Sequence, residues 1–199
     1  GTINSQVSVN NTLGFSIVKW STSTTLATVG HGLSSAPELI IGKGINWSSS
    51  WPVYALPIGN TKKMSLNDTS IPSTSTIWGN TTPTATTFNQ DFTGTAGRTN
   101  IAYCFTSKPG FSKVGSYTGS GNTSGQMVNT GFEPAFLMVK ATGIAGTWAI
   151  YDNKRDPSNP RDTILQPNTS DADLTSSTFN LSFFANGFQF TGANNDVNK

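Results

Sequence analysis

The run Asn100-Ile101-Ala102-Tyr103-Cys104-Phe105-Thr106 alternates large apolar residues with smaller or polar ones. Successive side chains of a β-strand point to opposite faces, so this period of two is typical of a strand with one face in a core. Clusters of Gly, Asn, Ser and Pro separate similar short segments rich in β-branched and aromatic residues. The segments expected as strands in the first half of the chain are Gln6 to Val9, Phe15 to Trp20, Thr25 to Val29, Glu38 to Gly42, Trp51 to Ala55, Lys63 to Asn67, Thr86 to Asn89 and Asn100 to Thr106.

Near the other end of the chain, Phe184, Phe188 and Phe190 surround Asn186-Gly187, a dipeptide favoured in hairpin turns. No window of useful length has the 3.6-residue period of an amphipathic helix. The sequence therefore predicts an all-β protein made of antiparallel sandwiches or jelly rolls.

The chain also contains an internal repeat. Gly14-Phe15-Ser16-Ile17-Val18 recurs 96 positions later as Gly110-Phe111-Ser112-Lys113-Val114. Further matches keep nearly the same spacing, and small loop insertions are enough to explain the drift. They are Pro37-x-Leu39-Ile40-Ile41-x-Lys43 with Pro134-x-Phe136-Leu137-Met138-x-Lys140, Trp51-x-x-Tyr54 with Trp148-x-x-Tyr151, and Phe92-Thr93-Gly94 with Phe190-Thr191-Gly192. We therefore expect two tandem β-sandwich modules related by duplication, with the strands of the second following at the spacing of the first.

The expected modules are residues 1–107 and 108–199, with Lys108-Pro109 as the joint. The second module then lacks a counterpart of Ala102 to Phe105, which leaves two alternatives. If that strand closes the first module, the second has an unpaired edge that another subunit or further chain must cover. If it opens the second module, the segment Ile3 to Val9 opens the first and both modules are whole. The first alternative is favoured, because the run leads at once into a polar joint.

Charge is sparse on this chain. Charged residues make up 11% of the 199, and 12 Lys and Arg against 10 Asp and Glu leave a net charge of +2. No basic run could neutralise a phosphate backbone, so nucleic acid is not an expected partner. The longest apolar runs, such as Phe136-Leu137-Met138-Val139, are far shorter than the ~20 residues of a membrane-spanning helix, so no membrane insertion is expected. Cys104, the only cysteine, is expected to be a buried strand residue.

Several segments together resemble a repeat module of virion structural proteins in marine tailed phages, cyanophages in particular. They are GFSIVKW, ATVGHGL, SAPELIIGK, TIWGNTTPT, IAYCF, GFSKVGSYTG, NTGFEPAFLMVK and GTWAIYDNKRD. Proteins with this pattern are described as capsid knobs, tail fibres or adhesins. The resemblance implies a place on the particle surface and partners among other virion proteins, including further copies of the chain. It implies no catalytic residue.

Nucleophilic hydrolysis requires a base beside a Ser or Cys. The only histidine, His31, lies in a glycine-flanked turn and aligns with Thr130, so it is expected to be a turn or packing residue. A glycosidase needs two carboxylates across a cleft, and the only glutamates, Glu38 and Glu133, fall near but not at matching positions.

Aspartates do gather in the second half of the chain, and a polysaccharide-degrading enzyme would have to use them. We expect instead solvated loop charges paired with Lys154, Arg155 and Arg161. The aspartates are Asp152, Asp156, Asp162, Asp171 and Asp173. Asp171-Ala172-Asp173 could supply two calcium ligands, but no spaced Asp/Asn/Gly loop surrounds it. No cofactor or metal is predicted, since zinc-ligand spacings and phosphate-binding loops do not occur.

The five tryptophans divide into two groups. Trp51 and Trp148 match across the repeat and are expected in the core. Trp20, Trp47 and Trp78 have no Trp partner across the repeat. Trp47, in a polar loop, could pack within its own module, contact another subunit or stack on a sugar. Trp78 favours packing more strongly, and these two residues are the candidate ligand-binding positions. Residues expected to be largely buried are Phe15, Leu39, Ile41, Trp51, Cys104, Phe111, Phe136, Met138 and Trp148.

The leading hypothesis is a non-enzymatic surface protein of a tailed-phage virion, either a capsid knob or decoration or a tail-fibre module. The alternative is a carbohydrate- or receptor-binding adhesin module that recognises a host-surface glycan.

Overall fold

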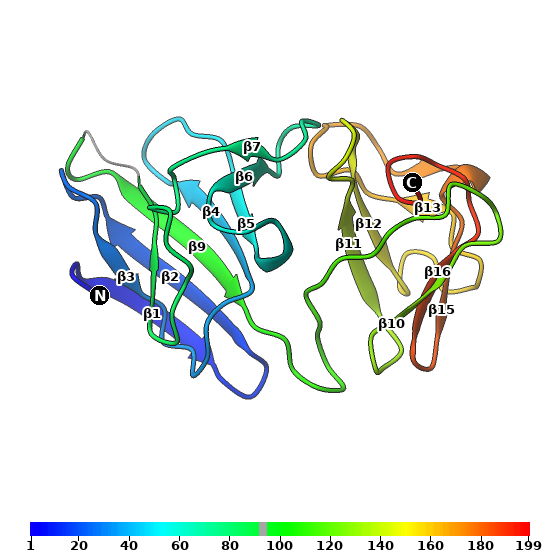
Figure 1. Ribbon diagram of the computed structural model, residues 1–199, viewed down its shortest axis with the longest axis horizontal. Coiled ribbons are helices and arrows are strands. Elements are labelled where there is room, and N and C mark those ends of the chain that lie inside the picture. The colour runs from blue at the N-terminus through cyan, green and yellow to red at the C-terminus, as the bar shows by residue number, and fades with distance from the viewer. Residues whose placement is uncertain (92–94) are drawn as a thin grey trace. The chain divides into compact units, whose positions relative to one another are not determined.

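The computed structural model describes residues 1–91 and 95–199, and it is an all-β protein with antiparallel sheets (Figure 1). One compact unit consists of Gly1–Leu66 and Pro72–Gly115, and the other of Asn67–Ile71 and Ser116–Lys199. The predicted division into modules of residues 1–107 and 108–199 stays a prediction. The Phe92-Thr93-Gly94 part of the predicted repeat lies outside the described residues.

The first unit is built on a seven-stranded antiparallel sheet in the order β1-β2-β9-β4-β5-β6-β7. Its strands are β1 (Ser5–Asn10), β2 (Phe15–Ser21), β9 (Thr99–Phe105), β4 (Leu39–Gly44), β5 (Pro52–Ala55), β6 (Lys62–Ser65) and β7 (Ser73–Thr74). A short 3-10 helix, η1 (Leu56–Ile58), follows β5. The strand segments predicted from the sequence therefore match observed strands, with ends shifted by a few residues.

A short pair, β3 (Thr28–Gly30) with β8 (Thr87–Asn89), supplies the second layer of this unit. Its residues Val29 and Phe88 share one buried cluster with Val18 and Trp20 of β2. The rings of Trp20 and Phe88 meet edge to face with centroids 5.6 Å apart, a favourable aromatic geometry. The unit is therefore sandwich-like, with a large sheet packed on a small one.

The second unit contains three small antiparallel sheets. Its core joins Tyr151, Phe188 and Phe190 with other buried apolar residues. The strands are β10 (Met127–Asn129) with β16 (Gly187–Phe190) and β15 (Leu181–Phe184), β11 (Phe136–Lys140) with β12 (Trp148–Asp152), and β13 (Thr163–Ile164) with β14 (Leu174–Thr175); η2 (Ser177–Phe179) precedes β15. The predicted hairpin forms between β15 and β16, with Ala185 and Asn186 in the turn.

Strand pairing follows the same register in the two units. Leu39 pairs with Ala55 and Ile40 with Tyr54 in the first unit. The residues 97 positions later repeat these pairs, since Phe136 lies opposite Asp152 and Leu137 opposite Tyr151. This is what an internal duplication predicts, although the duplication itself stays a prediction.

The strand that the sequence left between two alternatives belongs to the first unit. β9 lies between β2 and β4 and pairs with both along its length. This is the arrangement expected if Ala102 to Phe105 close the first module.

A second GFS strand does not form, which corrects the prediction that every strand of the second copy follows the spacing of the first. Residues 111–116 belong to no strand, and the β-bridge between Ser112 and Lys108 is an isolated one. A strand needs a neighbour for its backbone N–H and C=O groups. The strand before this segment, β9, is already paired on both sides, so it cannot serve here as β1 serves β2.

The burial prediction holds for only part of its set. Cys104 and Trp148 are buried. The predictions for Phe111 and Phe136 are wrong, since these residues are 56% and 58% exposed. The remaining five are half-buried because they lie on the outer side of a sheet or beside one: Phe15, Leu39, Ile41, Trp51 and Met138.

Candidate functional site

Three central strands of the first unit carry apolar side chains on both faces. Toward the core, Val18, Ile40 and Cys104 are buried. On the opposite, outer face, pairing aligns side chains from β2, β9 and β4 into three rows. The rows are Phe15, Phe105 and Leu39; Ile17, Tyr103 and Ile41; and Lys19, Ile101 and Lys43. We call these nine residues the outer patch.

The outer patch is accessible. Lys19 is exposed and the other eight residues are half-buried. The rings of Phe15 and Phe105 touch, with centroids 4.9 Å apart and planes inclined by 36°. An antiparallel sheet with one face on the core usually places polar residues on the other. Seven apolar side chains out of nine on that face therefore mark a surface suited to binding another macromolecule.

The borders of the patch are well defined. On one side it meets the polar residues Gln6, Ser8 and Asn10 of β1. On the other side Ile41 lies opposite Val53 of β5, which is fully buried. The two lysines fall in the same end row, which gives that end a positive charge. An apolar centre with a polar and charged border is the usual composition of a protein–protein interface.

The outer patch was not predicted as a site from the sequence. Phe15, Leu39 and Ile41 were expected in the core, because each lies in an apolar run. In runs such as Phe15-Ser16-Ile17-Val18 and Leu39-Ile40-Ile41, both alternating sets of side chains are wholly or mostly apolar. This pattern indicates that both faces of the strand avoid water. Only the strand register shows which of the two sets faces outward.

Trp47 packs against its own unit. Its indole N–H donates to Asn100 Oδ1 at 3.0 Å, and the Arg98 guanidinium lies 4.5 Å from the ring centroid. A Cβ at Gly44 would lie 2.5 Å from the indole nitrogen, so the absence of a side chain there makes room for the ring. These contacts are those expected if Trp47 packs within its own module.

Trp78 is a core residue. It is 1% exposed and meets Tyr54 edge to face at 5.7 Å. The suggestion that Trp78 contacts a ligand is therefore corrected, because burial leaves no ring surface on which a ligand could stack. Tyr54 is itself buried, and this burial raises the pKa of its hydroxyl, with a smaller contribution from the charge of Glu38.

His31 is a packing residue in this structure. It is fully buried, its Nδ1 accepts a hydrogen bond from Leu33 N at 3.1 Å, and its Nε2 lies 3.2 Å from Thr84 O. Because Nδ1 accepts, Nε2 carries the proton and donates to the carbonyl. Burial lowers the pKa of His31, and the bond to Thr84 opposes that shift. Neither nitrogen is left to act as a base.

Glu38 is also engaged. Its carboxylate accepts a hydrogen bond from the Ser107 hydroxyl, and Ser107 Oγ accepts from Val114 N at 3.0 Å. This fixes the chain just after β9. Glu133 is exposed and lies in the other unit.

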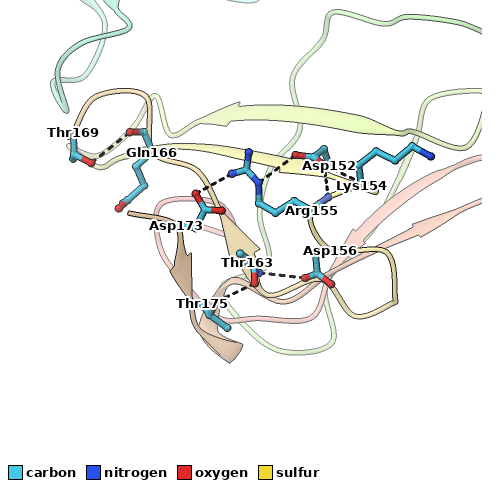
Figure 2. A network of polar contacts seen from close by, with 9 residues as sticks. All are labelled: Asp152, Lys154, Arg155, Asp156, Thr163, Gln166, Thr169, Asp173 and Thr175. Carbon is cyan, nitrogen blue, oxygen red and sulfur yellow. Dashed lines mark hydrogen bonds and ion pairs between the residues drawn. The ribbon is translucent and has the colours of Figure 1, made fainter. Parts of the chain in front are cut away.

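Asp152, Asp156 and Asp173 of the second unit make polar contacts with neighbouring residues (Figure 2). Asp152 Oδ1 accepts from Lys154 N and Arg155 N at 2.9 and 2.7 Å. Arg155 pairs with Asp152 at 3.5 Å and with Asp173 at 3.2 Å. The bond from Arg155 N is the main reason that the pKa of Asp152 is lowered. This confirms the expected ion pairing for Arg155, and a low carboxyl pKa is opposite to what a general acid needs.

The remaining loop charges also stabilise backbone. Asp156 Oδ2 accepts from Asp162 N at 2.8 Å and from Thr163 N at 3.3 Å. Arg161 is buried and donates to Asn159 Oδ1 and to the carbonyl of Pro157, and its guanidinium lies 4.4 Å from the Phe183 ring centroid. The expectation that Arg161 pairs with an aspartate is not met, since amide, carbonyl and ring contacts hold it instead.

Residues 1–91 and 95–199 contain no group of three or more His, Cys, Asp or Glu side chains placed to hold a metal ion. Within the same residues, no helix combines the length and apolar character needed to cross a membrane.

Fold and site together define an all-β protein with a sandwich-like unit and an apolar outer sheet face. The chain belongs to the family described as Domain of unknown function (DUF7483), whose model matches residues 1–199. No curated protein and no solved structure matches the chain.

Proposed function

We propose that this chain is a non-enzymatic surface component of a tailed-phage virion, as a capsid knob or decoration or as a module of a tail fibre. The observation that carries the proposal is the outer patch, a sheet face suited to docking on another virion protein. The resemblance of both halves to virion repeat modules supplies the biological setting.

The hydrophobic effect favours covering the outer patch. Burying apolar side chains contributes roughly 25 cal/mol per Å² removed from water. Aromatic anchors surrounded by smaller apolar residues are typical centres of stable interfaces, and the patch has Tyr103 in its middle row beside the Phe15–Phe105 pair. Assembly on a particle also brings many copies together, so a modest contact is multiplied.

The proposal of a non-enzymatic role is supported by the contacts of the side chains that could act as a base, an acid or a nucleophile. His31 and Cys104 are buried, and Glu38, Asp152 and Asp156 accept hydrogen bonds from neighbouring groups. Each of these side chains has a structural task that accounts for its position.

The test has two parts. An antibody to this chain should label intact virions, and its binding to particles should be visible by electron microscopy. Ile41→Lys and Ile17→Lys should each reduce incorporation into particles at least about tenfold, because a charge in the centre of an interface is strongly unfavourable. Leu26→Lys, the same change at an exposed apolar residue outside the patch, is the control. Unlabelled virions, or unchanged incorporation of folded patch variants, would contradict the proposal.

Glycan binding is a second candidate, supported by an open surface depression with both polar and apolar lining at the Lys19 end of the patch. Its volume is about 340 Å³, and Asn4, Gln6, Lys19 and Thr99 are among its lining residues. Amide and hydroxyl groups of this kind suit sugar hydroxyls. A glycan array should return at least one binder whose signal falls with Gln6→Ala and with Lys19→Ala but persists with Leu26→Lys. An array with no signal above background removes this candidate.

A further inference from the structure

The two units differ at one strand edge. In the first unit, β9 pairs with β4 along its whole length, from Leu39 opposite Phe105 to Gly44 opposite Asn100. β11 repeats the position of β4, since its register with β12 matches that of β4 with β5. In the described part of the chain, however, β11 has β12 as its one strand partner. The edge that β9 covers in the first unit is open in the second.

The backbone groups on that open edge can be assigned. Ala135 O accepts from Asn153 N at 3.0 Å, so residue 135 points toward the β12 side. Because the direction of backbone groups alternates along a strand, Phe136 and Met138 point theirs to the outer edge. In the first unit the matching residues are Leu39 and Ile41, which lie opposite Phe105 and Tyr103.

Side-chain exposure indicates the same missing neighbour. Phe136, at 58%, is the most exposed large apolar residue in the described chain. Its sequence counterpart, Leu39, lies opposite Phe105 of β9 and is half-buried. Phe136 therefore exposes the apolar surface that an aromatic residue of β9 covers in the first unit.

We propose that the outer edge of β11 accepts an extended segment of a partner polypeptide as an antiparallel strand. An open strand edge with apolar residues is adhesive, and strand addition satisfies its backbone groups with little rearrangement. β1, the outer strand of the large sheet, is a less suitable edge, because its exposed apolar residues are only the small Val7 and Val9 and its outer-face row consists of Gln6, Ser8 and Asn10. This inference rests on the repeat register and does not depend on the virion assignment.

The chemistry of the partner segment follows from β9. Ala102 and Cys104 face the core and are small, whereas Tyr103 and Phe105 lie on the outer face. The partner segment is therefore expected to have at least five residues, with small residues alternating with large apolar ones. The partner segment is also expected to place an aromatic residue opposite Phe136, as β9 places Phe105 opposite Leu39.

The probe is a fluorescent peptide that copies residues 98–106 with Cys104→Ser, titrated into the full chain. Saturable binding is expected, with slowed hydrogen exchange along Phe136 to Lys140. Met138→Pro removes an outward N–H and keeps the bonds to β12, so it should weaken binding about tenfold. Phe136→Ala should weaken it severalfold without touching the edge backbone, and it serves if the proline variant fails to fold. Leu174→Ala, at another exposed apolar residue, should leave it unchanged.

Three outcomes would overturn the proposal. One is the absence of saturable binding up to ~1 mM peptide, the limit of a useful contact. Another is binding that Met138→Pro and Phe136→Ala leave unchanged, because the peptide would then occupy a different edge or exchange with β9 itself. The third is slowed hydrogen exchange confined to the first unit. A scrambled peptide of the same composition controls for non-specific adhesion.

Discussion

Phe15 of β2 and Phe105 of β9 lie side by side on the outer face of the first sheet, with ring centroids 4.9 Å apart. These residues are 90 positions apart in the chain, and β9 is the last strand of its unit. The contact therefore joins the beginning and end of the first unit. Together with Leu39, these two residues form the first of the three rows of the outer patch.

The two matched tryptophans should differ in energetic weight. Trp148→Ala is expected to lower the free energy of unfolding by ~3–5 kcal/mol, because the side chain is buried. Trp51 is half-buried with Lys43 Nζ 5.7 Å from its ring centroid, so Trp51→Ala should cost clearly less. Urea denaturation followed by circular dichroism measures both. Equal losses would contradict the assignment of Trp148 alone to the core.

Stability should depend on pH through His31. Burial lowers its folded pKa below the unfolded value of 6.5, so the unfolded state binds more protons as the pH falls. The contribution of neutral His31 to the free energy of unfolding is therefore fully present above about pH 6.5. It is lost as the pH falls from there toward the folded pKa of His31. Denaturation at pH 7.5 and 5.5 should show the loss.

The control for His31 is His31→Gln, which places an amide donor near Thr84 O and cannot titrate. This variant should be less stable overall but should lose much less stability between the two pH values. An identical pH dependence in the variant would assign the effect to other groups.

Cys104 should be unreactive while the protein is folded. The thiol is fully buried and its pKa is raised to about 12, mainly by burial. Only the thiolate is nucleophilic, so both access and ionisation oppose modification. Ellman's reagent at pH 8 should label the native chain at least about a hundredfold more slowly than the urea-unfolded chain. Rapid labelling of native protein would show that β9 is not held between β2 and β4.

In the loops of the second unit, a carboxylate that accepts hydrogen bonds from the backbone should contribute more to stability than a surface ion pair. Asp156→Ala removes the acceptor for two backbone N–H groups and should cost ~1–3 kcal/mol of unfolding free energy. Arg155→Ala removes ion pairs at the surface and should cost ~1 kcal/mol or less. Added salt should reduce only the Arg155 effect. The reverse order would point to a role for Arg155 beyond its ion pairs.

The sequence by itself determined the class of fold and most strands of the first unit. Alternation and turn residues are local properties, so segments such as Phe15 to Trp20 and the β15–β16 hairpin could be found without tertiary information. The buried state of Cys104 followed in the same way from its place in an alternating run.

Tertiary structure alone decided which neighbours each strand has. The GFS motif at residues 14–16 leads into strand β2 because β1 and β9 lie on either side. The same motif at Phe111 lacks such neighbours and is not a strand. Strand register also decided that Ser16 and Val18 face the core, whereas Phe15 and Ile17 face outward as part of the outer patch. Both outcomes depend on backbone partners far away in the chain, and pairing energy is available only where such a partner is in place.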